Sequence, residues 1–195
     1  GQGGAPRAAI YMGQNKHTEA NRIMNNCFVV LILEAVVLTV FFWFFGEQLL
    51  WLFGCSEQTI VYALPYMQIY VSGSIFVMLA LGMNLFITTQ GFTRFSMTSV
   101  LIGAGANIIL DPVFIFGLKM GVVGAGIATV IGEMAAGILC LLYLRRLQSV
   151  QLEKGALRPT WPVTKMILQL GFPSLLTQGL TALVQIVLNN LMRVY

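Results

Sequence analysis

Long runs of apolar residues, separated by short polar stretches, set the pattern of the whole chain. Each run holds about 20 residues or more, and a helix of that length, rising 1.5 Å per residue, crosses the roughly 30 Å hydrocarbon core of a bilayer. The pattern predicts an all-α fold, a polytopic bundle of transmembrane helices. The predicted spans are residues 23–45, 61–89, 96–116, 122–144 and 166–191.

Composition supports the same class. Hydrophobic residues make up 57% of the chain and charged residues only 9%, and the mean hydropathy is +0.82. Soluble domains have about a quarter of their residues charged. The composition therefore excludes an ordinary soluble domain and indicates a protein whose helices contact membrane lipid.

Basic residues collect in alternate loops. The predicted loops 7–22, 90–95 and 145–165 hold Lys and Arg, whereas the intervening loops hold Lys119 alone. By the positive-inside rule the basic loops are cytoplasmic, in a multi-pass protein of the cell inner (cytoplasmic) membrane. The net charge of +4 thus reflects topology. It does not indicate a nucleic-acid partner, because no basic patch alternates with aromatic residues.

The last basic loop is also the best linker candidate. It contains a glycine and two prolines among polar residues, a composition typical of connecting segments. We therefore expect a bundle over residues 1–148, a cytoplasmic linker over 149–165 and a further helix over 166–195. The chain starts without Met and stops just after an apolar run, so it is expected to be a fragment of a longer protein.

Acidic residues inside the predicted spans are the main candidates for function: Glu34, Asp111 and Glu133. A charge in the hydrocarbon core is costly, so such groups face a bundle interior or a wet cavity. Asn107 and Asp111 are four residues apart, as are Thr129 and Glu133, which puts each pair on one helix face. Glu34 has only apolar neighbours one turn away, so snorkelling or pairing with another helix is expected there.

The third and fourth spans are joined by the short turn "GLKMG" and should form an antiparallel hairpin. Counting from Lys119 in both directions predicts that Asp111 is level with Thr129, and Asn107 level with Glu133. These four residues form the predicted cation-coupling site. The alternative for Asp111 is a hydrogen-bonded role in helix packing.

Pro112 directly follows the key carboxylate. It has no N–H to donate to the preceding turn, so a bend or a freed carbonyl is expected beside Asp111. Broken helices at membrane depth often mark ion and substrate sites. Tyr66 and Asn84 in the second span are candidates for the lining of a substrate cavity.

The sequence offers nothing for enzymatic chemistry. His17 is the only histidine, and the three cysteines, Cys27, Cys55 and Cys140, are scattered without metal-ligand spacing. No Ser/His/Asp or Cys/His set is present. The opening "GQGGA" lacks the context of a phosphate-binding loop and is better explained by tight helix packing. We expect no enzyme activity, no cofactor and no metal site apart from a possible sodium ion at Asp111.

Four stretches resemble one known family: "NIILDPVFIFGLKMGVVGAGIATVIGE", "MGQNKHTEANR", "TTQGFTRFSM" and "GFPSLLTQG". They are similar to bacterial members of the multidrug and toxic compound extrusion (MATE) family, and the resemblance covers nearly all of the chain. It implies two pseudo-symmetric bundles of six helices that open alternately to each side. On that comparison the chain runs from the end of the family's second helix to its seventh.

The resemblance also implies a set of site residues. The family's cation site in the first bundle uses an Asn and an Asp four residues apart and a Thr on the following helix, which match Asn107, Asp111 and Thr129. A tyrosine and an asparagine of the fourth helix, here Tyr66 and Asn84, often join that cavity. The first helix of the family, which supplies another carboxylate, has no counterpart in this chain. Glu133 departs from the pattern, since an uncharged residue is expected at its position.

The expected function is a secondary antiporter that exports cationic drugs in exchange for H⁺ or Na⁺, acting as a monomer. The first alternative is a flippase for lipid-linked saccharides of the same superfamily. A basic cavity for pyrophosphate is expected in such a protein, whereas the buried groups here are acidic. The second alternative is a non-transporting or channel-like membrane subunit, which would not exchange ions for drugs.

Overall fold

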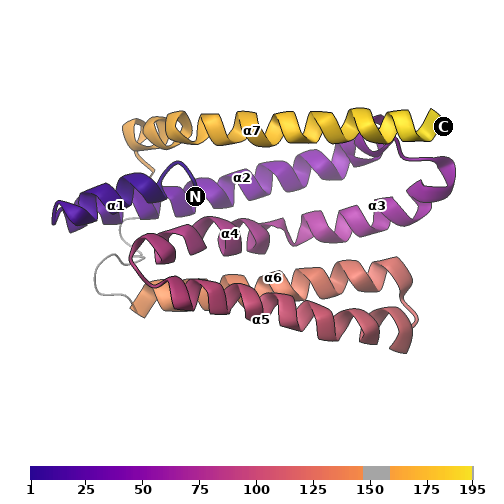
Figure 1. Ribbon diagram of the computed structural model, residues 1–195, viewed down its shortest axis with the longest axis horizontal. Coiled ribbons are helices and arrows are strands. Elements are labelled where there is room, and N and C mark those ends of the chain that lie inside the picture. The colour runs from indigo at the N-terminus through magenta and orange to yellow at the C-terminus, as the bar shows by residue number, and fades with distance from the viewer. Residues whose placement is uncertain (147–158, 195) are drawn as a thin grey trace.

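The computed structural model describes residues 1–146 and 159–194, with side chains up to Leu191. Every regular element in these two ranges is helical. Figure 1 shows the helices side by side with roughly parallel long axes, α5 and α6 along one side and α7 along the other. The elements are α1 (Ala5–Gly13), α2 (His17–Leu52), α3 (Glu57–Ser72), α4 (Ser74–Thr89), α5 (Thr93–Pro112), the π-helix η1 (Val113–Gly117), α6 (Gly121–Arg146) and α7 (Trp161–Val194).

The predicted all-α transmembrane fold is confirmed. Four segments are long and apolar enough to cross a membrane, namely α2, α5 with η1, α6 and α7. A fifth span results if the bent pair of α3 and α4 counts as one. Each predicted span falls inside one of these segments, because runs of apolar residues are what lipid selects.

The second predicted span, residues 61–89, is not one straight helix. It divides into α3 and α4, whose axes differ by 56°. The break is at Gly73, where an added Cβ would lie 2.6 Å from the side chain of Val130 on α6. Glycine weakens a helix interior and permits close approach of a neighbour, and both properties favour a bend here.

Residues 7–22 were predicted to form a cytoplasmic loop, but most of them are helical. The prediction of a loop is therefore wrong. This segment contains most of α1 and the start of α2, joined by a tight turn in which Asn15 has a φ of 58°. The glycine-rich start serves helix packing, as expected. A Cβ added at Gly4 would overlap the sulfur of Cys27, and Ala5 and Ala8 are fully buried.

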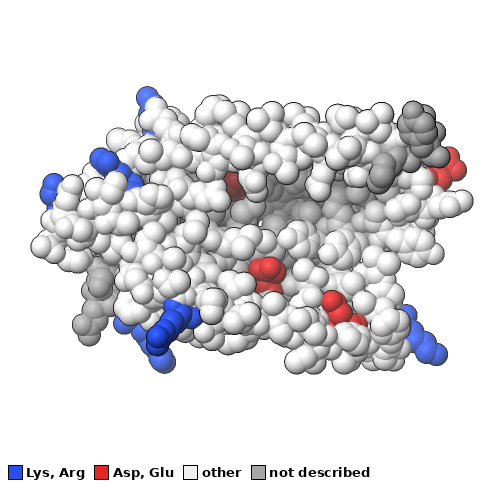
Figure 2. Space-filling model, viewed as in Figure 1, with Lys and Arg blue, Asp and Glu red and all other residues white. Residues whose placement is uncertain are grey.

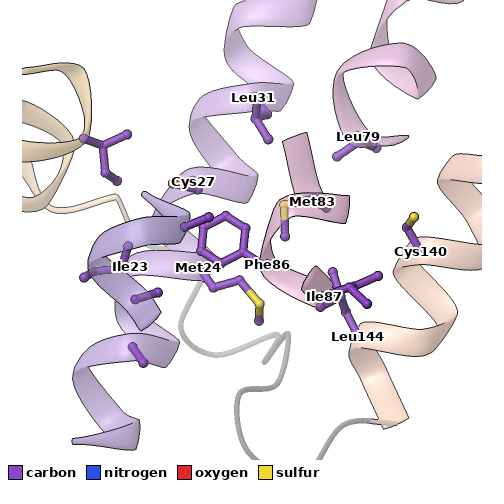
Figure 3. Close-up of a cluster of buried hydrophobic side chains, with 14 residues drawn as sticks. Ile23, Met24, Cys27, Leu31, Leu79, Met83, Phe86, Ile87, Cys140 and Leu144 are labelled. Atoms are coloured by element: carbon purple, nitrogen blue, oxygen red, sulfur yellow. The ribbon is translucent and has the colours of Figure 1, made fainter. Parts of the chain in front are cut away.

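A hydrophobic cluster joins five helices at the end of the bundle where α1 lies (Figure 3). Most of its residues come from the first half of α2, from α4 and from the end of α6, with smaller contributions from α1 and α7. Met24, Met83 and Ile87 are completely buried. Most other large apolar side chains are exposed, as expected for helices that face lipid. The labelled members are Ile23, Met24, Cys27, Leu31, Leu79, Met83, Phe86, Ile87, Cys140 and Leu144.

Charges separate along the long axis of the bundle. Figure 2 shows most Lys and Arg side chains of this face at the end where α1 lies, with acidic groups between the ends and at the opposite end. The start of α5, which carries Arg94, and the end of α6, which carries Arg145 and Arg146, lie at the basic end. The arrangement agrees with the positive-inside topology inferred from the loops.

The predicted linker, residues 149–165, falls mostly on 147–158, which lie outside the described residues. Its last part belongs to α7, which begins at Trp161. Near this start the side-chain amide nitrogen of the buried Asn26 of α2 donates to the Thr160 hydroxyl at 3.2 Å, and the Thr164 hydroxyl donates to the Asn26 side-chain oxygen at 3.1 Å. The division into 1–148 and 166–195 remains a prediction.

Two glycines bring α5 and α6 into backbone contact. A Cβ added at Gly103 would lie 2.9 Å from the carbonyl oxygen of Gly132, and one added at Gly132 would lie 2.7 Å from the carbonyl oxygen of Gly103. Small residues at such crossings let membrane helices approach closely, where van der Waals contacts are strongest. This contact fixes the relative position of the two helices that carry the candidate site.

Replacing Gly103 by Leu should therefore destabilise the bundle by about 1–3 kcal/mol, because the new side chain cannot fit against α6. Thermal unfolding of the purified protein in detergent measures the loss. Gly105→Leu is the matched control, since a Cβ at Gly105 meets no atom within 4 Å. Equal melting temperatures for the two variants would contradict the importance of the glycine contact.

Candidate functional site

The candidate site is built on a hydrogen bond between α5 and α6. The side chains of Asn107 and Thr129 lie 3.1 Å apart, and the Thr129 hydroxyl is also 2.9 Å from the carbonyl oxygen of Ala125. Both side chains are half-buried. Polar pairs of this kind join helices in a membrane because lipid offers them no other partner.

The orientation of the Asn107 amide connects this pair to Asp111. In one orientation the amide nitrogen donates to the Asp111 Oδ2 at 2.9 Å, and the amide oxygen accepts from the Thr129 hydroxyl at 3.1 Å. An ionised carboxylate only accepts hydrogen bonds, so this orientation is the one that satisfies an ionised Asp111. The three predicted residues thus form one continuous network.

The predicted register of the hairpin is wrong by about one helical turn. Asn107 is level with Thr129 and not with Glu133. Asp111 follows Asn107 by one helical turn, so it lies closer to the connection between α5 and α6. The count assumed α-helical geometry up to the turn, whereas η1 follows directly after Pro112. A π-helix places more residues in each turn, so the same number of residues spans less length.

The expected departure from α-helix beside Asp111 is confirmed. Regular α-helix ends at Pro112, and the Leu118 N–H donates to the carbonyl of Val113, five residues back, at 2.9 Å. Pro112 has no N–H for the carbonyl of Ile108, which removes one bond of the α-helical ladder. π-Helical turns occur often at functional sites.

A cavity of about 340 Å³ opens between α4, α5 and α6. Four of the predicted site residues line it: Asn84, Asn107, Thr129 and Glu133. The rest of the lining is apolar or small, with Ser99 as a further polar residue. Three consecutive helices therefore bring the predicted polar groups to one hollow.

Two oxygens near this cavity have unused hydrogen-bonding capacity. The Asn84 amide nitrogen donates to the carbonyl of Ser96 at 3.3 Å, but its Oδ1 is buried without a hydrogen-bond partner in the described part of the chain. The same holds for Oδ1 of Asp111. Buried polar atoms normally have partners, so unpaired oxygens indicate a place for a donor or a cation.

Tyr66 and Glu34 lie outside the cavity lining. Tyr66 packs against α6, where a Cβ added at Gly126 would lie 3.4 Å from its ring, and it stacks on Tyr70 with the ring centroids 6.3 Å apart. Glu34 is exposed on α2. The predicted role of Tyr66 in a substrate cavity stays a prediction.

Sequence reasoning missed two residues of this region. Ser99 lines the cavity, and Tyr70 adds a second aromatic ring next to Tyr66. Tyr70 had a usable signal, because it follows Tyr66 by four residues and so shares its helix face.

Carboxylate, amide and hydroxyl oxygens, the donors gathered here, bind hard cations such as Na⁺. Asp111, Asn107 and Thr129 would hold such an ion, and Asp111 alone would hold a proton. Among the described residues no group of three or more His, Cys, Asp or Glu side chains suits a metal ion. The oxygen atoms gathered here are of the kind that bind a small cation.

The sequence profile described as MatE matches residues 1–113. This chain belongs to the MatE family. The family consists of multidrug efflux transporters, multi-pass proteins of the cell membrane, and not of enzymes.

Two curated relatives are multidrug export proteins named MepA. The one from Staphylococcus haemolyticus is 26% identical over all of this chain and 43% of its own length. The one from Staphylococcus saprophyticus is 31% identical over 82% of this chain and 35% of its own length. This MatE chain thus spans about two fifths of the length of the relatives it matches.

Solved structures show the same fold. An inward-facing multidrug resistance MATE transporter of the MOP superfamily superposes with a TM-score of 0.90 at 24% identity, over 97% of this chain and 43% of the other. An outward-facing conformation of such a transporter superposes with a TM-score of 0.83 over 90% of this chain and 40% of the other, also at 24% identity.

Replacing Thr129 by Val keeps the shape of the side chain but removes the hydroxyl that bonds Asn107. One hydrogen bond is worth about 1 kcal/mol, so we expect the affinity for the coupling ion to fall about fivefold. The ion dependence of transport by the full-length MatE protein measures this. Thr98→Val is the control, because the exposed Thr98 hydroxyl bonds only the Arg94 carbonyl of its own helix. Equal ion dependence in the two variants would contradict the network.

Proposed function

We propose that this chain forms most of the first bundle, and the first helix of the second bundle, of an antiporter that exports cationic organic compounds in exchange for H⁺ or Na⁺. One observation carries the proposal. Acidic and amide side chains converge on a cavity at the depth of the membrane spans, and none of its lining residues is basic. Such a cavity attracts cations and repels anions.

Asp111 is the proposed site of the coupling ion. An acidic group within a membrane span is retained at a cost, which a functional cation offsets when it binds. Na⁺ would take oxygens from Asp111, Asn107 and Thr129. A proton would occupy Asp111 alone.

The Asn107 amide links the ionisation state of Asp111 to a hydrogen bond with Thr129 on α6. With Asp111 ionised, the amide nitrogen donates to the carboxylate and the amide oxygen accepts from Thr129. With Asp111 protonated, the carboxyl donates to the amide oxygen, and the reversed amide donates to the Thr129 hydroxyl. The hydrogen bond between α5 and α6 thus reverses with the state of Asp111, directly beside the π-helical turn.

The proposed division of the chain places residues 1–148 in the first bundle, residues 149–165 in a cytoplasmic linker and residues 166–195 in the second bundle. α7 begins slightly earlier, at Trp161. It contacts α2 near its start, where Thr164 donates to Asn26, and near its end, where Asn190 donates to the Leu52 carbonyl at 3.3 Å. These two contacts would join the bundles at opposite ends of α2. The transporter acts as a monomer whose exposed apolar side chains contact lipid.

A lipid-linked saccharide flippase is the main rival. Its pyrophosphate substrate is anionic and would need Lys or Arg in the cavity. The described Lys and Arg side chains lie instead near the ends of the helices, and none lines the cavity. The same acidic lining also distinguishes the chain from a purely structural subunit, which has no use for buried carboxylates.

Asp111→Asn should abolish gradient-driven efflux while leaving membrane insertion intact. The amide keeps the shape of the side chain, but it has no negative charge to bind Na⁺ and it does not take up a proton. The assay is ethidium uptake into everted vesicles that contain the full-length transporter, under an imposed proton or sodium gradient. The wild type should respond to one of the two gradients.

Glu34→Gln is the matched control, because it removes an acidic group of a span that lies outside the cavity. Its uptake should equal that of the wild type. Normal gradient-driven uptake by Asp111→Asn would overturn the assignment of the coupling site. Absence of uptake by the wild type under either gradient would overturn the antiporter itself.

A further inference from the structure

Glu133 is an acidic residue of the cavity that the network around Asp111 leaves unused. It lies on α6, is half-buried and lines the cavity. No salt bridge or hydrogen bond satisfies its carboxylate within the described ranges, in which the basic side chains lie toward the ends of the helices. An ionised group at this depth needs a positive partner, and the described protein residues supply none.

Glu133 is too far from Asp111 to share one ion with it. Asp111 lies one turn from Asn107 toward the α5–α6 turn, and Glu133 follows Thr129 by one turn in the opposite direction along the bundle. At 1.5 Å per residue these two turns separate the acids by about 12 Å along the helices. Oxygen ligands hold a hard cation at roughly 2–2.6 Å, so each acid must serve a different cation.

Two aromatic rings lie on the helix that faces this side of α6. Tyr66 and Tyr70 of α3 are stacked with their planes 6° apart. α3 is held against α6 by the contacts of Tyr66 with Gly126 and of Gly73 with Val130. Glu133 follows Gly126 by seven residues and Val130 by three, so it shares the face of α6 that packs on α3. A carboxylate next to parallel aromatic faces is the combination that binds organic cations, through charge and through cation–π attraction.

We propose that Glu133, Tyr70 and Tyr66 form a subsite for the organic cation, separate from the ion site at Asp111, Asn107 and Thr129. This inference rests on the proposed antiporter function and names the residues that bind its substrate. Glu133 was predicted from the sequence as part of the cation-coupling site. The inference assigns it to substrate binding instead. The preferred ligand is a monovalent aromatic cation, whose ring packs on Tyr70 while its charge faces Glu133.

The distance between the two sites gives a physical reason for exchange. Across about 12 Å, with an effective dielectric constant of about 20, one positive charge weakens the binding of a second by about tenfold. The effect is reciprocal, so an ion arriving at Asp111 favours release of the organic cation and the reverse. Two cation sites at this spacing therefore favour antiport over co-transport.

Equilibrium binding of ethidium to the purified full-length transporter, followed by fluorescence polarisation, tests the subsite without any ion gradient. Glu133→Gln should weaken ethidium binding at least about tenfold, and Tyr70→Leu should weaken it also, whereas Tyr70→Phe keeps the ring and should bind like the wild type. Glu34→Gln is the control acid. In vesicles, the ion concentration that gives half-maximal transport should rise by no more than about tenfold in Glu133→Gln, which is the effect of one charge lost at about 12 Å.

Wild-type ethidium affinity in Glu133→Gln would overturn the subsite. So would a shift in ion dependence with unchanged ethidium affinity, because Glu133 would then belong to the coupling site. These results differ from failure of the antiporter proposal, in which the wild type shows no gradient-driven transport whatever its ethidium affinity. If Glu133→Gln does not fold, the contrast between Tyr70→Leu and Tyr70→Phe decides the question.

Discussion

The close crossing of α5 and α6 is the contact on which the rest of the site depends. Gly103 and Gly132 bring the two backbones together, and this places Asn107 within hydrogen-bonding distance of Thr129. A larger side chain at either glycine would push the helices apart and break the network that reaches Asp111. Packing and chemistry are therefore linked: the smallest residues in the hairpin position its most polar ones.

The membrane explains why so few polar residues carry the function. Helices that face lipid expose apolar side chains, so polar groups inside the spans are kept only where they contact one another or a ligand. Here the lining of one cavity includes two amides, a carboxylate and two hydroxyl groups, and the carboxyl of Asp111 lies beside it. A hollow of this chemistry, open between α4, α5 and α6, suits cations in a bilayer that otherwise excludes them.

Much of the fold and of the candidate site was predictable from the sequence. The length of an apolar run indicates a span that contacts lipid, and helical periodicity indicates which residues share a helix face. The spans, the topology and the grouping of Asn107 with Asp111 followed from those patterns. The register did not, since a count of residues cannot detect the π-helix after Pro112. The bend at Gly73 and the helix α1 depend on tertiary contacts with Val130 and Cys27, which local patterns do not contain.

The central claim is that this chain belongs to a transporter that moves an organic cation against a coupling ion through Asp111. The most direct test follows the ion itself in sealed vesicles loaded with H⁺ or Na⁺. Addition of ethidium outside should release the coupling ion from wild-type vesicles in fixed proportion to ethidium uptake, and should release none from Asp111→Asn vesicles. Ethidium uptake without any ion release would contradict the exchange mechanism.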